Sequence, residues 1–121
     1  DLLMHELSVA QALLETLDRY QRGNGGSVKK MALTLGRLGG VDPDALRYAW
    51  PAALAANGNR ALADCGLEIE VLPLSFACRE CGTKIKAEKL TLECPACHRE
   101  TLVRDGGREL IIKHIEVEQN V

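Results

Sequence analysis

Near the start of the chain, apolar residues recur at steps of three and four, which is typical of one face of a helix. This spacing predicts a helix over residues 4–22. Its apolar face consists of Leu3, Leu7, Ala10, Leu14 and Leu17. Residues 23–26 read Gly-Asn-Gly-Gly. Glycine and asparagine adopt the left-handed conformation that ends many helices, so the helix is expected to stop there.

A second helix is predicted to begin after Asp42. The Asp42 carboxylate can accept hydrogen bonds from the free amides of the first turn, and Pro43 suits the first helical position. The apolar face consists of Leu46, Ala49, Trp50, Ala53 and Leu54. Pro51 lacks an amide hydrogen, so we expect it to kink this helix or to end its regular part.

Three segments show the alternation of apolar and polar residues that is typical of strands. They span residues 28–38, 67–74 and 109–117. In the first, Met31, Leu33 and Leu35 share one face. Pro73 predicts that pairing of the second strand stops there. The third strand places Ile111, Ile115 and Val117 on one face, which Lys113 interrupts.

Two C-x-x-C pairs, separated by twelve residues, lie between the second and third strands. They consist of Cys78, Cys81, Cys94 and Cys97. Two facing turns of this kind can form the four-thiolate tetrahedron that Zn²⁺ favours, and such a closed site is structural. His98 follows directly and is a further candidate ligand, for the zinc or for an adjacent nickel site; the alternative is that it lies outside the ligand set or is exposed. The alternatives are two disulfides or four unrelated buried thiols.

The order of elements is helix, strand, helix, strand, cysteine lobe and strand. It predicts an α+β fold, with two helices on a small mixed three-stranded sheet and an inserted zinc-ribbon-like lobe. We assign residues 1–74 and 107–121 to the α/β domain and residues 75–106 to the four-cysteine domain. The last strand is expected to rejoin the first domain's sheet. A homodimer that exchanges this strand or the lobe is compatible with such an arrangement.

Composition and charge limit the classes of function that the chain can have. The net charge is −2 and aromatic residues make up 3%, which argues against a protein that binds nucleic acid through phosphates or base stacking. No run of eighteen apolar residues exists that could span a membrane. The start shows no secretory signal pattern. Five cysteines, four of them in metal spacing, fit a reducing compartment, so a cytoplasmic protein is expected.

Met4, His5 and Glu6 stand at the head of the first helix. We expect Met4 to be the natural start and residues 1–3 to be an extension. The α-amine of Met4, the amide nitrogen of His5 and its imidazole could then form adjacent chelate rings, and nitrogen-rich sites of this kind favour Ni(II) or Cu(II). The alternative is that His5 is a capping or surface residue.

Taken together, the chain resembles the HypA/HybF family of nickel metallochaperones for hydrogenase maturation. The resemblance covers nearly the whole chain in one order. It is carried by residues 4–8 (Met-His-Glu-Leu-Ser), the strand and turn of residues 28–41, the four cysteines, and residues 108–110 and 115–118. One departure is Arg37, which stands where the family usually has glutamate.

The resemblance implies that Ni(II) binds at the Met-His-Glu start. His5 is then the main ligand, and the amine or backbone nitrogens of Met4 and Glu6 complete the site. It also implies a structural zinc in the cysteine lobe and nickel as transported cargo. The implied partners are a maturation GTPase of the HypB type and a [NiFe]-hydrogenase large subunit, and the protein is not an enzyme.

Two other functions compete with this one. A zinc-ribbon module that binds nucleic acid or a protein partner would explain the four cysteines but not the Met-His-Glu start. A metal-dependent hydrolase would need an open metal position and a general base, which a four-thiolate cage does not offer.

Overall fold

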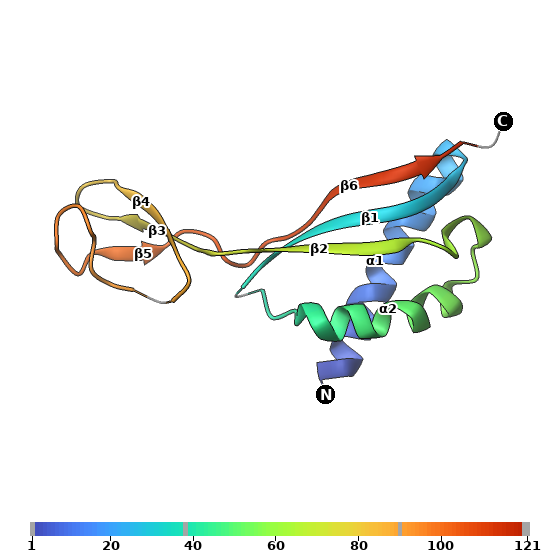
Figure 1. The fold of residues 1–121 in the computed structure, drawn as a ribbon, viewed down its shortest axis with the longest axis horizontal. Coiled ribbons are helices and arrows are strands. Elements are labelled where there is room, and N and C mark those ends of the chain that lie inside the picture. The colour runs from blue at the N-terminus through green and yellow to red at the C-terminus, as the bar shows by residue number, and fades with distance from the viewer. Residues whose placement is uncertain (1, 38, 90, 120–121) are drawn as a thin grey trace.

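The computed structural model describes residues 2–37, 39–89 and 91–119. The elements in chain order are α1 (Leu2–Asn24), β1 (Ser27–Gly36), α2 (Pro43–Asn57), the 3₁₀ helix η1 (Arg60–Leu62), β2 (Gly66–Leu72), β3 (Leu74–Cys78), β4 (Lys84–Ala87), β5 (Leu102–Arg104) and β6 (Leu110–Glu118). They form a helix-bearing lobe and a smaller lobe at the other end of the elongated molecule (Figure 1). The predicted α+β class is confirmed. The predicted end of the first strand, Leu38, lies outside the described residues.

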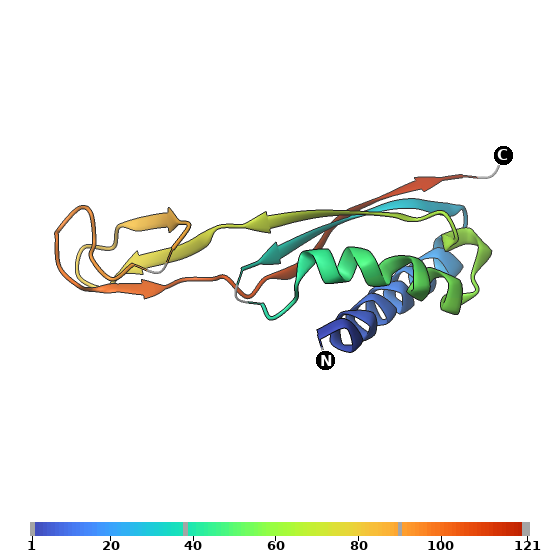
Figure 2. The ribbon, with the colours of Figure 1, turned by 60° about the horizontal axis from the view of Figure 1, so that its bottom comes forward.

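The larger lobe is built on a three-stranded sheet in the order β2-β1-β6. The central strand β1 runs parallel to β2 and antiparallel to β6, so the sheet is mixed, as predicted. Both helices lie on one face of this sheet (Figure 2). Since β6 returns from the small lobe to pair with β1, the chain between β2 and β6 is held at both of its ends.

The core lies between the helices and the sheet. Its fully buried side chains include Leu14, Leu17, Met31, Leu33, Leu35, Leu46 and Leu62. These are largely the residues that the periodicity assigned to apolar faces. Trp50 adds a directional contact, because its indole Nε1–H donates to the carbonyl of Cys65 at 2.8 Å. This bond ties α2 to the segment that enters β2. None of the described helices is long and apolar enough to cross a membrane.

The third strand differs from the prediction in which isoleucine it buries. Leu33 of β1 pairs with Ile112, whereas Met31 pairs with Ile115, so the register shifts by one residue between these pairs. Ile112, Ile115 and Val117 therefore pack on the core, while Ile111 lies beside Thr34 and is 52% exposed. A bulged residue reverses the alternation of faces on either side of it. The placement of Ile111 with Ile115 was wrong for this reason.

Pro51 does not end α2, which continues to Asn57. Asp42 caps the helix as predicted, accepting hydrogen bonds from the amides of Asp44 and Ala45, and Gly58 ends it in the left-handed conformation. Pro51 is exposed. The carbonyl that lacks a donor four residues earlier belongs to Arg47, another exposed residue, so water can satisfy it.

The end of β1 and the segment that follows it contact both lobes. The amide of Gly36 donates to the carbonyl of Glu109 at 2.8 Å, where the chain returns into β6. Arg37 forms an ion pair with Glu88 of the small lobe. Five residues further on, the amide of Asp42 donates to the carboxylate of Glu6 in α1. This short connection therefore joins the start of α1 to the small lobe.

Gly36→Ala should destabilise the protein by about 1–3 kcal/mol or more, which is typical of overpacking. A Cβ at position 36 would overlap the carbonyl group of Gly107 and lie 2.7 Å from the amide nitrogen of Glu109. Urea unfolding followed by Trp50 fluorescence measures the change. Gly23→Ala is the matched control, because its Cβ would meet no atom within 4 Å and alanine favours the helix by up to about 1 kcal/mol. Equal stabilities for the two variants would contradict the close approach.

Candidate metal centres

The small lobe is a three-stranded antiparallel sheet, in the order β4-β3-β5, that carries two cysteine turns. Cys78 ends β3, and Cys81 lies in the turn toward β4. The second pair, Cys94 and Cys97, lies in the loop before β5. β4 lies between the two cysteine pairs and pairs with β3 across the first turn, and β5 pairs with the other edge of β3.

The two turns have matching backbones. The amide of Gly82 donates to the carbonyl of Cys78 at 3.1 Å, and the amide of His98 donates to the carbonyl of Cys94 at 2.8 Å. Both donors have a positive φ, 77° for Gly82 and 62° for His98. His98 thus occupies the left-handed position that closes its turn, and histidine is among the residues that tolerate it. Its side chain is exposed.

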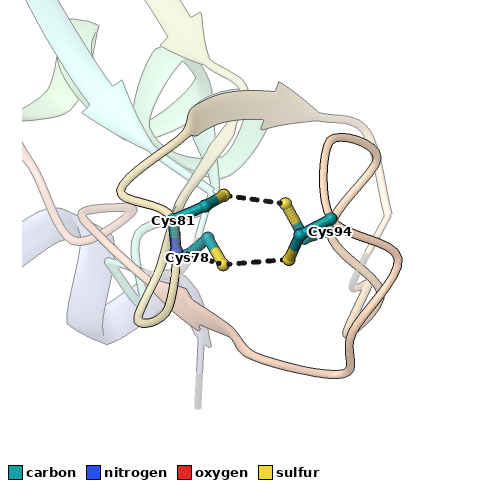
Figure 3. Close-up of side chains that lie close together, drawn as sticks. Cys78, Cys81 and Cys94 are labelled. Carbon is teal, nitrogen blue, oxygen red and sulfur yellow. Dashed lines mark hydrogen bonds between the residues drawn. The ribbon is translucent and has the colours of Figure 1, made fainter.

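The four thiols converge on one point, and Figure 3 shows three of them labelled. Among the described residues, they form the one group of three or more candidate ligands whose ligand atoms lie within 4.8 Å of one another, so His98 is not a member. The Sγ atoms are 3.7 Å apart for Cys78 and Cys97, and 3.6 Å apart for Cys81 and Cys94. A tetrahedral zinc with Zn–S bonds of about 2.3 Å has sulfur–sulfur edges of about 3.8 Å. The cluster therefore fits a structural Zn²⁺, and its sulfur atoms are too far apart to form disulfide bonds.

The surroundings of the thiols are unequal. The amide of Cys81 and the hydroxyl of Thr101 lower the pKa of the Cys78 thiol to about 6. The amide of Cys97 lowers the pKa of Cys94, but burial and the neighbouring thiols outweigh it and raise the value to about 11. Cys94 is fully buried, whereas Cys81 is exposed. The Cys81 side of the thiol cluster is therefore more exposed than the Cys94 side.

Cys65 belongs to neither turn. It lies in the core of the larger lobe, where burial raises the pKa of its thiol to about 11. Its Sγ lies 3.6 Å from the carbonyl oxygen of Gly66. Cys65 is therefore a packed core thiol, and a thiol with a raised pKa is a poor nucleophile and metal ligand.

At the start of α1, His5 is exposed while Glu6 is completely buried. Glu6 Oε1 accepts a hydrogen bond from the amide of Asp42 at 3.2 Å and lies 4.0 Å from His5 Nε2. The other oxygen, Oε2, has no hydrogen-bond partner among the described residues. Burial of a carboxylate oxygen without a partner is costly, so this oxygen is a candidate ligand for a cation. The side chain of Met4 is outside the description, although its backbone lies in α1.

Sequence reasoning placed His5 and Glu6 at this end of the molecule, but it missed that Asp42 joins them. Asp42 was assigned to the cap of α2 alone, and that assignment is confirmed. Glu6 and Asp42 are 36 residues apart, and no local pattern in the sequence connects them. The start of α1 and the cysteine turns lie in different lobes (Figure 1).

The fold and these two clusters define a class of small two-lobed proteins, with a helix-bearing domain joined to a four-cysteine ribbon. A family model described as "HypA: Hydrogenase/urease nickel incorporation, metallochaperone, hypA" matches residues 4–117. The chain therefore belongs to the HypA family of nickel metallochaperones.

Individual relatives agree with this membership. The chain is 32% identical over 117 residues to the hydrogenase maturation factor HypA of Chlorobium limicola, covering 96% of this chain and 98% of that protein. It is 34% identical over 116 residues to HypA of Rhodopseudomonas palustris strain TIE-1, covering 95% and 100%.

Solved structures share the fold. The solution structure of the Ni metallochaperone HypA from Helicobacter pylori superposes with a TM-score of 0.64 at 18% identity, covering 95% of this chain and 98% of that one. A second solution structure of a HypA protein has a TM-score of 0.73 at 19% identity, covering 97% and 98%.

Cys81→Ser should abolish stoichiometric zinc binding and loosen the small lobe, because a structural zinc supplies folding free energy. Elemental analysis measures the zinc, and limited proteolysis within residues 74–104 measures the order of the lobe. Cys65→Ser should keep one zinc per chain, since Cys65 lies in the other lobe. If Cys81→Ser kept its zinc and a protease-resistant lobe, the assignment of this thiol to the cage would be wrong.

Proposed function

We propose that this chain binds Ni(II) at its Met4-His5-Glu6 segment and delivers it for [NiFe]-hydrogenase maturation, while the four cysteines hold a structural zinc. Membership of the HypA family supports the role in nickel handling. The observation that supports this site is the exposed imidazole of His5 beside the buried carboxylate of Glu6, whose Oε2 has no hydrogen-bond partner among the described residues. An imidazole with nearby nitrogen and oxygen donors suits Ni(II) better than it suits hard cations.

Backbone amide nitrogens can bind a metal at this site only where they are not already hydrogen-bonded within the helix. Amide nitrogens inside an α-helix donate to carbonyls one turn earlier and are not free to bind a metal. In the structure, His5 and Glu6 are part of α1. In this chain, coordination through the amide nitrogen of Glu6, which lies four residues after Leu2, therefore requires the first turn of α1 to open. In a chain that begins at Met4, the amides of His5 and Glu6 lie in the first turn and have no carbonyl one turn earlier, so they are free to join the amine of Met4. The imidazole of His5 can bind without opening of the first turn.

The two centres suit opposite tasks. A closed cage of four thiolates holds its metal, whereas a few ligands at an exposed helix start can be exchanged when a partner docks. We assign nickel handling to residues 1–74 and 107–121 and the zinc to residues 75–106. The partners proposed are a HypB-type GTPase and the large subunit of a [NiFe]-hydrogenase. The protein carries nickel as cargo and does not act as an enzyme.

A zinc ribbon that binds nucleic acid is the competing function, and the small lobe gives it little support. Binding of single strands commonly uses aromatic side chains on which bases stack. Phe76 is the one aromatic residue between positions 74 and 104, and it is 3% exposed. Its ring packs in the core of the lobe instead.

His5→Ala should remove the specific nickel site and leave zinc content and fold unchanged. We expect an affinity loss greater than the roughly 10–100-fold that removal of an outer-shell partner costs, because the imidazole itself is the ligand. Calorimetric titration with Ni(II) measures the affinity, both for this chain and for a version that begins at Met4.

His98→Ala and His114→Ala are the matched controls, since they remove the chain's two other histidines, both of which are exposed. Both controls should retain the nickel affinity. Full affinity in the His5→Ala variant would show that the nickel site lies elsewhere.

A further inference from the structure

Two threonine hydroxyls lie against the cysteine thiols. Thr101 Oγ1 is 3.0 Å from Cys78 Sγ and 4.0 Å from Cys97 Sγ, so it touches one thiol of each pair. Thr83 Oγ1 is 3.1 Å from Cys81 Sγ. Both threonines are half-buried. Neither belongs to a C-x-x-C turn, and the spacing of the cysteines does not single them out.

The backbone holds both threonines in place. The carbonyl of Thr83 accepts a hydrogen bond from the amide of Cys78 at 2.9 Å, and the carbonyl of Thr101 accepts one from the amide of Arg79 at 3.0 Å. Thr101 also immediately precedes β5, which pairs with β3 through Cys78 and Leu102. The hydroxyls therefore approach the sulfurs because two strands and a turn bring them there.

The chemistry fixes the direction of these hydrogen bonds once a metal is bound. Zinc-bound cysteines are thiolates and carry no proton, so the hydroxyl must be the donor. Four thiolates around Zn²⁺ leave a net charge of −2, which is costly in a partly buried site. Donors directed at the sulfurs spread this charge and orient the ligands.

We propose that the Thr101 and Thr83 hydroxyls donate hydrogen bonds to the zinc-bound thiolates and thereby set how tightly the small lobe holds its metal. This inference rests on the zinc site proposed above. Both are positioning residues, since they act through the cysteines. Thr101 donates its one hydroxyl hydrogen to Cys78 and lies beside Cys97 of the other pair, so its loss should mainly weaken zinc affinity. Thr83 covers the sulfur of the exposed Cys81, so its loss should mainly speed the transfer of zinc to a chelator.

Threonine-to-valine substitutions test the proposal in the full chain, because valine keeps the shape of the side chain and removes the donor. Thr101→Val should lower zinc affinity about 10-fold or more, within the range that loss of such a partner typically costs. Thr83→Val should accelerate zinc transfer to a competing chelator. The serine variants at both positions keep the hydroxyl and should retain wild-type behaviour. Thr91→Val is the matched control in the same lobe, since Thr91 is half-buried and makes no hydrogen bond to a sulfur within the described part of the chain.

Cobalt substitution supplies a readout that a purely structural role would not move. A thiolate that loses a hydrogen bond is more electron-rich, so the sulfur-to-Co(II) charge-transfer band of Thr101→Val should shift to longer wavelength. The Thr101→Ser band should stay in place. The proposal is overturned if the valine variants match the wild type in affinity, transfer rate and spectrum, or if serine is as damaging as valine.

These outcomes differ from failure of the zinc assignment itself. In that case the unsubstituted chain would hold no stoichiometric zinc and would give no tetrahedral Co(II)–thiolate spectrum. A zinc-loaded wild type with unaltered valine variants would leave the four-cysteine site intact and would remove only the role of the threonines.

Discussion

Strand β1 lies between β2 and β6, and both lobes depend on this pairing. β2 brings the chain to the small lobe and β6 brings it back, so the lobe is anchored at its two ends to the same sheet. The junction is tight, because Gly36 lies directly against the backbone of Gly107. Arg37, directly after this glycine, pairs with Glu88 of the small lobe.

The small lobe cannot be held by apolar burial alone. Its buried cluster consists of Leu74, Phe76, Cys78, Cys94 and Leu102, and two of these five residues are candidate metal ligands. Segments of fewer than about 40 residues usually need a metal or disulfides to fold. A zinc at the convergence of the four thiols would complete a core that the apolar side chains only begin. The larger lobe has its own core and does not share this need.

The two candidate centres differ in the ligands that they offer. The cysteine cage offers four thiols, and the two measured sulfur–sulfur distances are nearly equal. The start of α1 offers an exposed imidazole, a buried carboxylate and the amide of Asp42. The connection from β1 to α2 reaches both lobes, through Arg37 at one end and Asp42 at the other.

Much of this could be predicted from the sequence, because its causes are local. Apolar periodicity defined both helices and the three strands of the main sheet, the Asp42-Pro43 pair marked the start of α2, and the C-x-x-C spacing identified the thiol cluster. Each signal depends on residues a few positions apart, whose geometry the backbone sets by itself. Pro51 was the exception, because its cost depends on whether water reaches the unpaired carbonyl.

Tertiary structure decided what depends on distant partners. The bulge near Lys113 turned Ile112 rather than Ile111 toward the core, because of the pairing with β1. The burial of Glu6 against the amide of Asp42 joins residues 36 positions apart, and the contact of Thr101 with Cys78 spans 23. The sequence by itself determined the two α-helices, the strands of the main sheet and the ligand types. Only the folded chain determined which polar atoms meet, because such contacts form where packing brings separate elements together and leave no periodic trace in the sequence.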